Sequence, residues 1–188
     1  MKIQSPTPKG IDYVIQQFQN WLHTQLIARW GLSDVSTTDW LCYDRAYKNQ
    51  KTDGYVPEVY LTKNEYKEVL LDDKVKVTSF FGVGDTIEVD TQENQNVANV
   101  HLIFFVNLKK LKVTDARPDE ITRQDVQYFC NQDLYGFTLE GIQTGIEAVL
   151  SDYPGFMRES GMKHRDMNPF HCFRFNFSLR YDYDKHEC

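Results

Sequence analysis

Residues 171–183 read HCFRFNFSLRYDY, and this stretch decides the fold class. Apolar side chains, most of them aromatic, take every second position from Phe173 to Tyr183, and the positions between them are polar. Alternation with a period of two predicts a β-strand that has one apolar and one polar face. At ~3.3 Å per residue the strand would extend about 40 Å, whereas an ordinary strand has about five or six residues. We therefore expect part of this strand to leave the domain and meet a neighbour.

Three shorter strands are predicted earlier in the chain. Apolar and polar residues alternate at 75–83, a short strand follows at 87–89, and an almost continuous apolar run covers 100–108. The apolar run predicts a strand that is buried on both faces. The sequence GVGD at 82–85 predicts a turn between the first two strands, and the polar stretch at 91–96 predicts a second turn or a hairpin tip.

Helices are indicated where apolar residues recur every three or four positions. Such spacing predicts a helix at 10–30, which Gly31 would end with a left-handed cap. A second helix is predicted at 118–130, where Pro118 and two acidic residues suit a first turn. A third is predicted at 139–150, with its stripe formed by Leu139, Ile142, Ile146, Val149 and Leu150.

A long irregular segment separates the first helix from the strands. Residues 32–73 are rich in polar residues and show no sustained period, and within them only 55–61 weakly indicate an extended piece, so we expect a loop of about forty residues. Such loops are usually functional, and tyrosine is favoured where another chain buries a surface. The residues expected at an interface are tyrosines of this loop and of the last strand, namely Tyr43, Tyr47, Tyr55, Tyr60, Tyr66, Tyr181 and Tyr183.

Together these elements predict a single α+β domain at 10–183, with a flexible arm at 1–9 and a tail at 184–188. A chain of 188 residues has the size of one compact domain, which buries about 70% of its unfolded surface. We expect a mostly antiparallel sheet of about four strands, with the N-terminal helix and one or two further helices packed on one face.

Net charge and cysteine spacing exclude several classes of function. The formal charge of −6 argues against tight DNA binding, because phosphate contacts need many clustered cations and the densest group is Lys109, Lys110 and Lys112. The four cysteines form no C-x-x-C pair, so neither a zinc site nor a disulfide framework is favoured. No apolar run approaches the ~20 residues that cross a bilayer. We expect the protein to stay in a reducing cytoplasm, or in something assembled there, without membrane contact.

Three patterns invite a chemical function, and each has a plainer interpretation. Gly82 and Gly84 lack the third glycine of a phosphate loop and do not open a helix, which indicates a turn. The histidines and cysteines near the C-terminus match no zinc spacing, and they are His164, His171, His186, Cys172 and Cys188. We assign no catalytic, cofactor-binding or metal-binding residue. Acidic residues crowd the predicted loop in a manner typical of a solvated surface, and they are Asp44, Asp53, Glu58, Glu65, Glu68, Asp72 and Asp73.

Two stretches and the order of the elements resemble the neck and tail-terminator proteins of tailed phages. The stretches are GYVPEVY at 54–60 and AVLSDYPGF at 148–156. The order is an N-terminal helix, the loop, a three-stranded meander and a final aromatic strand. This similarity of architecture covers most of residues 10–183, and it suggests crAss-like phages of gut bacteria as the source.

The resemblance implies a structural virion protein without an active site. Family members form rings, usually of six or twelve copies, that sit between the head and the tail or cap the tail tube. The partners would be copies of the same chain and adjoining neck or tail proteins, and DNA would pass through an acidic channel without sequence-specific binding. The location would be the virion, assembled in the host bacterial cytoplasm, and we expect no enzyme activity.

Two other functions remain open on the residues alone. One is a metal-dependent nuclease that uses carboxylates of residues 44–73. DNA cleavage with magnesium or manganese that is lost on Asp72→Asn with Asp73→Asn would favour it. The other is a small intracellular adaptor or immunity-type binding domain, which would be monomeric alone and would recover one host partner in a pull-down.

Overall fold

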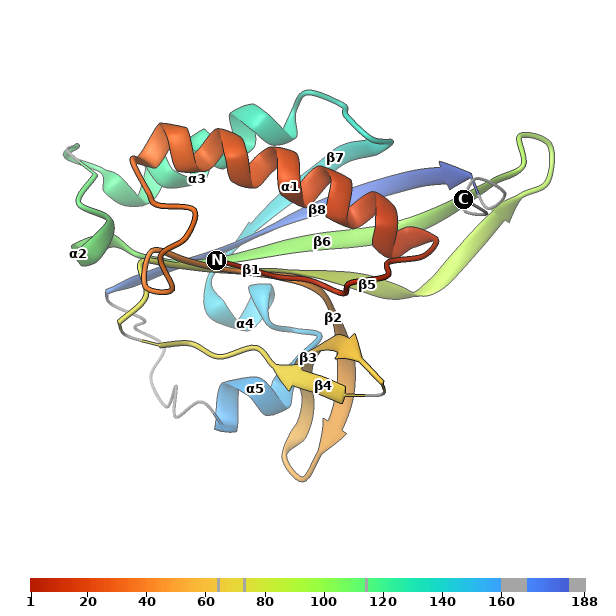
Figure 1. Cartoon of the computed structure of the whole chain (residues 1–188), viewed down its shortest axis with the longest axis horizontal. Helices are drawn as coiled ribbons and strands as arrows, with labels where there is room; N and C mark the ends of the chain where they lie inside the picture. The colour runs from red at the N-terminus through yellow and green to blue at the C-terminus, as the bar shows by residue number, and fades with distance from the viewer. Residues whose placement is uncertain (64, 73, 114, 160–168, 183–188) are drawn as a thin grey trace.

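The computed structural model describes residues 1–63, 65–72, 74–113, 115–159 and 169–182. In this part of the chain, eight strands form one mixed sheet in the order β4-β3-β2-β5-β6-β8-β7, with β1 paired to β2 (Figure 1). The pairs β1–β2 and β2–β5 are parallel, and the others are antiparallel. The strands are β1 (Lys2–Ile3), β2 (Trp40–Lys51), β3 (Gly54–Thr62), β4 (Glu65–Glu68), β5 (Val77–Asp90), β6 (Gln95–Asn107), β7 (Phe137–Thr144) and β8 (Phe170–Asp182).

Helices lie on both faces of this sheet (Figure 1). α1 and α3 cover one face, α4 and α5 lie against the other, and α2 follows β6 at one end. The prediction of about four mostly antiparallel strands with helices on one face is therefore wrong. The helices are α1 (Ile11–Trp30), α2 (Leu108–Leu111), α3 (Pro118–Cys130), α4 (Ile146–Val149) and α5 (Pro154–Glu159).

Each face of the sheet buries its own core, because successive residues of a strand point to opposite sides. Phe81 and Phe104 belong to the core under α1 and α3. Phe80 and Phe105, their neighbours in sequence, belong to the core on the α4 and α5 side. Burial on both sides explains the continuous apolar run of β6 and confirms the prediction for 100–108.

Two predicted helices are confirmed by α1 and α3. α1 ends at Gly31, whose left-handed backbone (φ 61°, ψ 37°) lets its N–H donate to the carbonyl of Ile27. The predicted stripe of α1 faces the sheet, and Phe18 stacks on Phe137 of β7 with the ring centroids 4.4 Å apart. The long helix is therefore fixed across the centre of the sheet.

β5 runs straight through the sequence GVGD at 82–85, so the turn predicted there is wrong. The ladder between β5 and β6 shifts register between Val83 and Ile87, and the chain turns at 91–94, as the polar stretch predicted. Gly82 lies directly opposite His101, and a Cβ on Gly82 would lie 1.9 Å from the His101 Nε2 atom. The glycine is therefore needed to make room for a buried imidazole rather than to turn the chain.

The segment 32–73, predicted as a loop, contains β2, β3 and β4. β2 and β3 form an antiparallel hairpin that closes with Lys51 opposite Gly54. The strand period is obscured because the register between β2 and β5 shifts between Cys42 and Arg45. Buried charged residues such as Asp44 also occupy positions where an apolar side chain would have revealed the pattern.

Residues 1–9, predicted as a flexible arm, begin with a strand. β1 pairs in parallel with β2, so that Lys2 lies opposite Cys42. The amino group of Met1 donates to the carbonyl of Trp40 at 2.6 Å, and the Ile3 side chain is buried. The start of the chain is thus part of the sheet. The predicted tail at 184–188 lies outside the described residues.

The helix predicted at 139–150 is replaced by β7 and the short helix α4. A register shift in β7 between Leu139 and Gly141 inserts one extra residue. Phe137, Leu139 and Ile142 consequently face the same core at spacings of two and three. This spacing imitates the stripe of a helix, which explains the error.

β8 confirms the alternation in its sequence, but not the expectation that part of it leaves the domain. It pairs with β6 along its whole length, from Phe170 opposite Asn107 to Asp182 opposite Gln95. The aromatic side chains at alternate positions lie in the core under α1. The unusual length of β8 is therefore used within its own sheet.

Candidate functional site

Two of the tyrosines predicted at an interface lie inside the domain. Tyr43 is 1% exposed and belongs to the core on the α4 and α5 side, while Tyr181 is buried in the core under α1. Tyr43 is covered by its own chain, whereas Tyr181, which is 8% exposed, borders a pocket described below.

Four other tyrosines of the set lie on the β2–β4 part of the sheet, and they are Tyr47, Tyr55, Tyr60 and Tyr66. The Tyr47 hydroxyl donates to an Asp12 carboxylate oxygen at 3.1 Å, and the rings of Tyr60 and Tyr66 meet edge to face, 5.4 Å apart. Tyr55 and Tyr66 are exposed and stay available to a partner. Tyr183 lies outside the described residues.

The acidic residues of 44–73 point to different places. Asp44 is buried and accepts hydrogen bonds from Gln16 Nε2 at 2.6 Å and from the Ser5 N–H, and burial raises the pKa of its carboxyl. Glu58 instead pairs with Lys51 at 2.6 Å. Across the described ranges, no three His, Cys, Asp or Glu side chains are placed to hold one metal ion. Asp73 lies outside those ranges.

The candidate metal ligands near the C-terminus are represented by His171 and Cys172. They are consecutive residues of β8, so their side chains point to opposite faces of the sheet and cannot share an ion. Burial raises the pKa of the Cys172 thiol well above its usual value. His164, His186 and Cys188 lie outside the described residues.

The β5–β6 hairpin projects beyond the rest of the sheet (Figure 1). β2 pairs with β5 only as far as Gly82, so within the described chain the outer edge of β5 from Gly84 to Asp90 has no strand partner. Ile87 and Val89 on this segment are 42% and 60% exposed. An unpaired strand edge with apolar side chains can pair with another chain, and proteins usually protect such edges.

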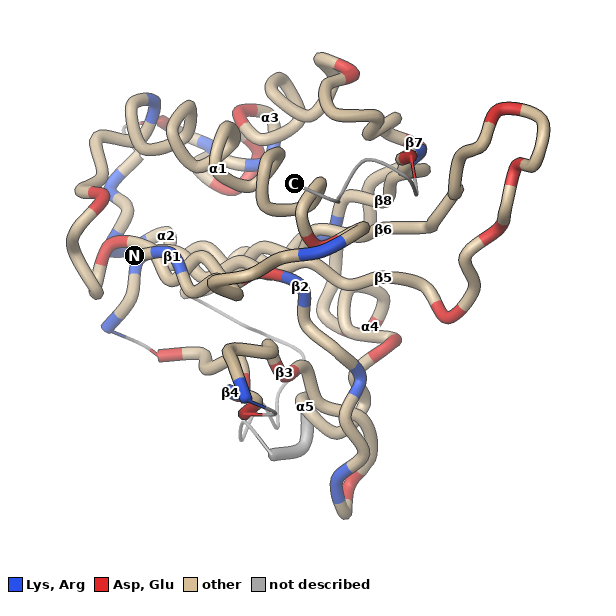
Figure 2. The backbone as a smooth tube through the Cα atoms, turned by 45° about the vertical axis from the view of Figure 1, so that its right-hand side comes forward, with Lys and Arg blue, Asp and Glu red and all other residues tan. Residues whose placement is uncertain are grey.

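The same hairpin is acidic, and the stretch 84–96 contains no lysine or arginine (Figure 2). Asp85 pairs with Lys48 of β2 at 3.0 Å, and Asp90 lies 3.9 Å from Arg180. Among the residues that the structure describes, Glu88 and Glu93 form no ion pair. The acidic side chains of the hairpin are Asp85, Glu88, Asp90 and Glu93.

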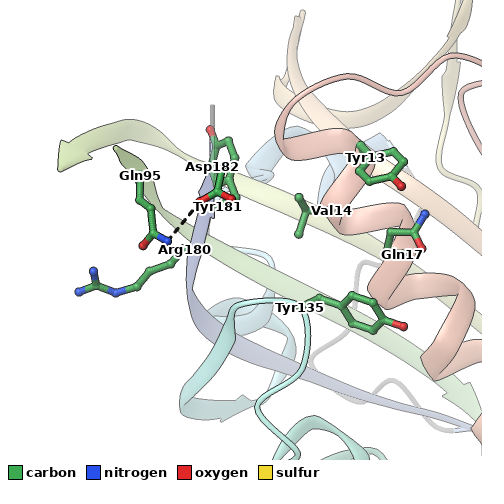
Figure 3. Close-up of a pocket in the computed structure, with 8 residues that line it drawn as sticks. All are labelled: Tyr13, Val14, Gln17, Gln95, Tyr135, Arg180, Tyr181 and Asp182. Carbon is green, nitrogen blue, oxygen red and sulfur yellow. Dashed lines mark hydrogen bonds between the residues drawn. The ribbon is translucent and has the colours of Figure 1, made fainter. Parts of the chain in front are cut away.

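A pocket of about 320 Å³ lies at the base of the hairpin (Figure 3). Tyr13 and Val14 of α1 line it together with Tyr135 and with the last residues of β8, including Tyr181. Val89 of β5 lies opposite Asn96 of β6, and Asn96 lies opposite Tyr181 of β8. Residues directly opposite one another point to the same face, so Val89 and Tyr181 are both on the α1 face. We call the projecting segment 84–96 and this pocket the hairpin end.

A second polar group lies on the opposite face, where the connection between α4 and α5 passes under the sheet. Asp152 in this connection accepts a hydrogen bond from Arg174 Nη1 at 2.5 Å, and its other carboxylate oxygen is 3.4 Å from Lys48 Nζ. His101 Nε2 lies 3.7 Å from Asp152. Lys48 and Asp152 also line a depression of about 500 Å³.

Electrostatics assign a structural role to this polar group. Loss of water around the buried ring, and then the positive charge of Arg174, lower the pKa of His101 to about 3, and its Nε2 has no hydrogen-bond partner in the described chain. Burial alone would raise the pKa of the Asp152 carboxyl. The combined effect of His101, Arg174 and Lys48 is larger and holds that pKa below its usual value. A charged carboxylate between two cations fastens the α4–α5 connection to the sheet and leaves no free acid or base.

Sequence reasoning missed this group, although signals for it exist. His101 interrupts the apolar run of β6, and Arg174 and Asn176 occupy the polar positions of β8 that point to the same face. Gly82 lies opposite His101 in a strand that is otherwise apolar. Polar residues at neighbouring positions of β6 and β8, next to a glycine in β5, indicate a buried polar cluster.

We expect the free energy of unfolding to fall as the pH is lowered from 7 to 5. The pKa values of His101 (about 3) and His23 (about 4), both lowered mainly by burial, lie below the value of about 6.5 in the unfolded chain. The unfolded chain therefore takes up protons that the folded chain does not, and stability that is present above pH 6.5 is lost on acidification. Each histidine contributes up to about 1.4 kcal/mol per pH unit in this window. Urea unfolding at several pH values measures this slope, and His101→Gln should make it shallower; an unchanged slope contradicts the assignment.

No helix in the described part of the chain is both long and apolar enough to cross a membrane. No protein-family model matches the chain, and no curated protein is significantly similar to it.

Proposed function

We propose that this protein is a structural component that assembles into a ring of identical copies, of the kind that joins the head to the tail in tailed phages. The observation that supports this best is the hairpin end, where a β5 edge that no described strand covers projects beside exposed Ile87 and Val89. Exposed apolar patches next to an open edge mark sites of association. Tyr13 and Tyr135, both partly exposed beside the pocket, extend the same surface.

The position of this surface supports a ring. The hairpin end lies at one extremity of the long axis, so its contact with a different part of a second copy is repeated in one direction (Figure 1). Such a heterologous contact closes into a ring when the rotation between copies allows it. Pairing of two hairpin edges about a two-fold axis would instead bring acidic residues together, which is unfavourable.

The ring proposal also gives the partners. Adjoining neck or tail proteins would contact the two flat sides of the ring, and DNA would pass through its centre. The net charge of −6 suits a channel that DNA crosses without sticking, because acidic walls repel phosphates. In this proposal the protein belongs to the virion and needs no catalytic group.

Light scattering after size-exclusion chromatography tests whether the hairpin end holds the ring together. We expect the wild-type chain to elute as an oligomer. The double variant Ile87→Ser with Val89→Ser should dissociate into monomers at a roughly tenfold higher protein concentration, because a loss of about 1.4 kcal/mol of contact energy changes the association constant tenfold. Val35→Ser is the matched control, since Val35 is 87% exposed and lies elsewhere. A double variant that assembles like the wild type would remove the hairpin end from the interface.

A further inference from the structure

We propose that the acidic hairpin of one copy binds a lysine patch on the next copy. The lysine patch consists of Lys109, Lys110 and Lys112, in α2 and directly after it. This inference rests on the ring proposed above, and it names the second surface that a heterologous contact requires.

The lysine patch is a built feature of the fold. The side chain of Asn107 accepts a hydrogen bond from the Lys110 N–H at 3.3 Å and caps α2, and Lys112 ends the helix in the left-handed conformation (φ 53°). This tight turn exposes all three lysines at neighbouring positions. In the described ranges none of them has an ion-pair partner, and the nearby Asp115 accepts from the Arg117 N–H instead.

The patch and the acidic hairpin cannot meet within one molecule. β6 connects them, with the hairpin turn before its first residue and α2 after its last residue, Asn107. A strand of 13 residues separates them by about 40 Å at ~3.3 Å per residue. Both views place them at opposite extremities of the molecule (Figures 1 and 2). An ion pair between the two surfaces would therefore have to form between two chains.

The charges of the two surfaces are complementary. Glu88 and Glu93 are exposed and form no ion pair among the described residues. Asp90 accepts hydrogen bonds from the Gln92 and Glu93 N–H groups, and its nearest cation is the exposed Arg180 at 3.9 Å. Opposite the three lysines, these carboxylates would steer one copy onto the next and set the direction of assembly. A second copy is thus the occupant that the charges favour. The contact should weaken as the salt concentration is raised from about 0.05 to 0.5 M, because salt screens exposed charges.

Charge reversal tests the pairing with four proteins. The hairpin variant is Glu88→Lys with Glu93→Lys, and the patch variant is Lys109→Glu with Lys110→Glu and Lys112→Glu. We expect each alone to need a concentration at least about tenfold higher for assembly, because like charges then face each other at every contact. The chain that carries both reversals regains complementary surfaces and should assemble like the wild type.

Mixing the hairpin variant with the patch variant gives the sharpest result. Each contact in an alternating assembly then joins opposite charges, so native mass spectrometry should show equal numbers of the two chains and only even copy numbers. Glu65→Lys with Glu140→Lys, at exposed positions of β4 and β7, is the matched control and should leave the wild-type mass unchanged. Circular dichroism confirms that each variant is folded, and the Gln versions of the same substitutions replace any that is not.

The outcomes separate this inference from the proposed function. If the wild type is an oligomer and each single reversal leaves its assembly unchanged, the pairing is overturned but the ring is not. If the patch reversal disrupts assembly and the hairpin reversal does not, the lysines bind another acidic surface, and the pairing is wrong. A wild-type chain that is monomeric at every concentration overturns both.

Discussion

Asp152→Asn should lower the free energy of unfolding by about 2–3 kcal/mol, at or below the low end of the range for a buried ion pair, because the Asp152 side chain is 27% exposed. The carboxylate accepts a 2.5 Å hydrogen bond from Arg174, whose side chain is only 14% exposed. Without the negative charge, Arg174 stays charged in a half-buried site beside His101 and keeps its hydrogen bond to Asn176 Oδ1 at 2.7 Å, but it has no counter-charge from Asp152. Chemical denaturation followed by tryptophan fluorescence measures the loss.

Asp85→Asn is the matched control for this substitution. Asp85 contacts the same Lys48 that lies near Asp152, but its side chain is 83% exposed. An exposed ion pair contributes between about 0 and 1 kcal/mol, so we expect a change within about 0.5 kcal/mol. Equal effects of the two substitutions would show that Asp152 does not anchor the α4–α5 connection.

Gly82→Ala should destabilise the protein by about 1–3 kcal/mol, the usual range for overpacking in a tight core. The added methyl group would lie 1.9 Å from His101 Nε2 and 2.6 Å from the Tyr153 hydroxyl, and both rings are buried. Neither ring can move without leaving its neighbours in the core on that side. A fall in the midpoint of thermal unfolding measures the effect.

Gly141→Ala serves as the control, because nothing lies within 4 Å of a Cβ at Gly141. The bulge in β7 leaves this position open, and alanine should be tolerated within about 0.5 kcal/mol. If Gly82→Ala is equally harmless, the result contradicts the close packing of His101 against Gly82 of β5. A larger effect at Gly141 would lead to the same conclusion.

Much of the fold could be predicted wherever one regular period governs a segment. The stripe of α1 with its Gly31 cap, the alternation of β8 and the apolar run of β6 each follow from burial on a helix face, on one strand face or on both strand faces. These signals depend only on neighbours along the chain.

The errors arose where long-range contacts replace the local period. The bulge in β7 gave Leu139 and Ile142 a helix-like spacing, and the imidazole of His101 made a glycine necessary in the middle of β5. Buried Asp44 accepts a hydrogen bond from Gln16, which is distant in the sequence. None of these partners can be recognised before the strand order is known.

The candidate interface was harder to predict than the fold. Tyrosine content suggested a contact surface in the segment 32–73 and in the last strand, but Tyr43 and Tyr181 pack into cores, while the edge of β5 that no described strand covers lies elsewhere. An edge is a property of the strand order, because β5 loses its partner where β2 turns away after Ala46. The run of acidic residues at 85–93 was the available signal, since charged residues often protect an open strand edge.

Native mass spectrometry of the unmodified chain at near-physiological salt is the most direct measurement. The proposed assembly predicts one dominant species whose mass is an integer multiple of the 22.1 kDa chain, with six or twelve copies expected for a neck or tail ring. A single species at 22.1 kDa across the accessible concentration range would contradict it.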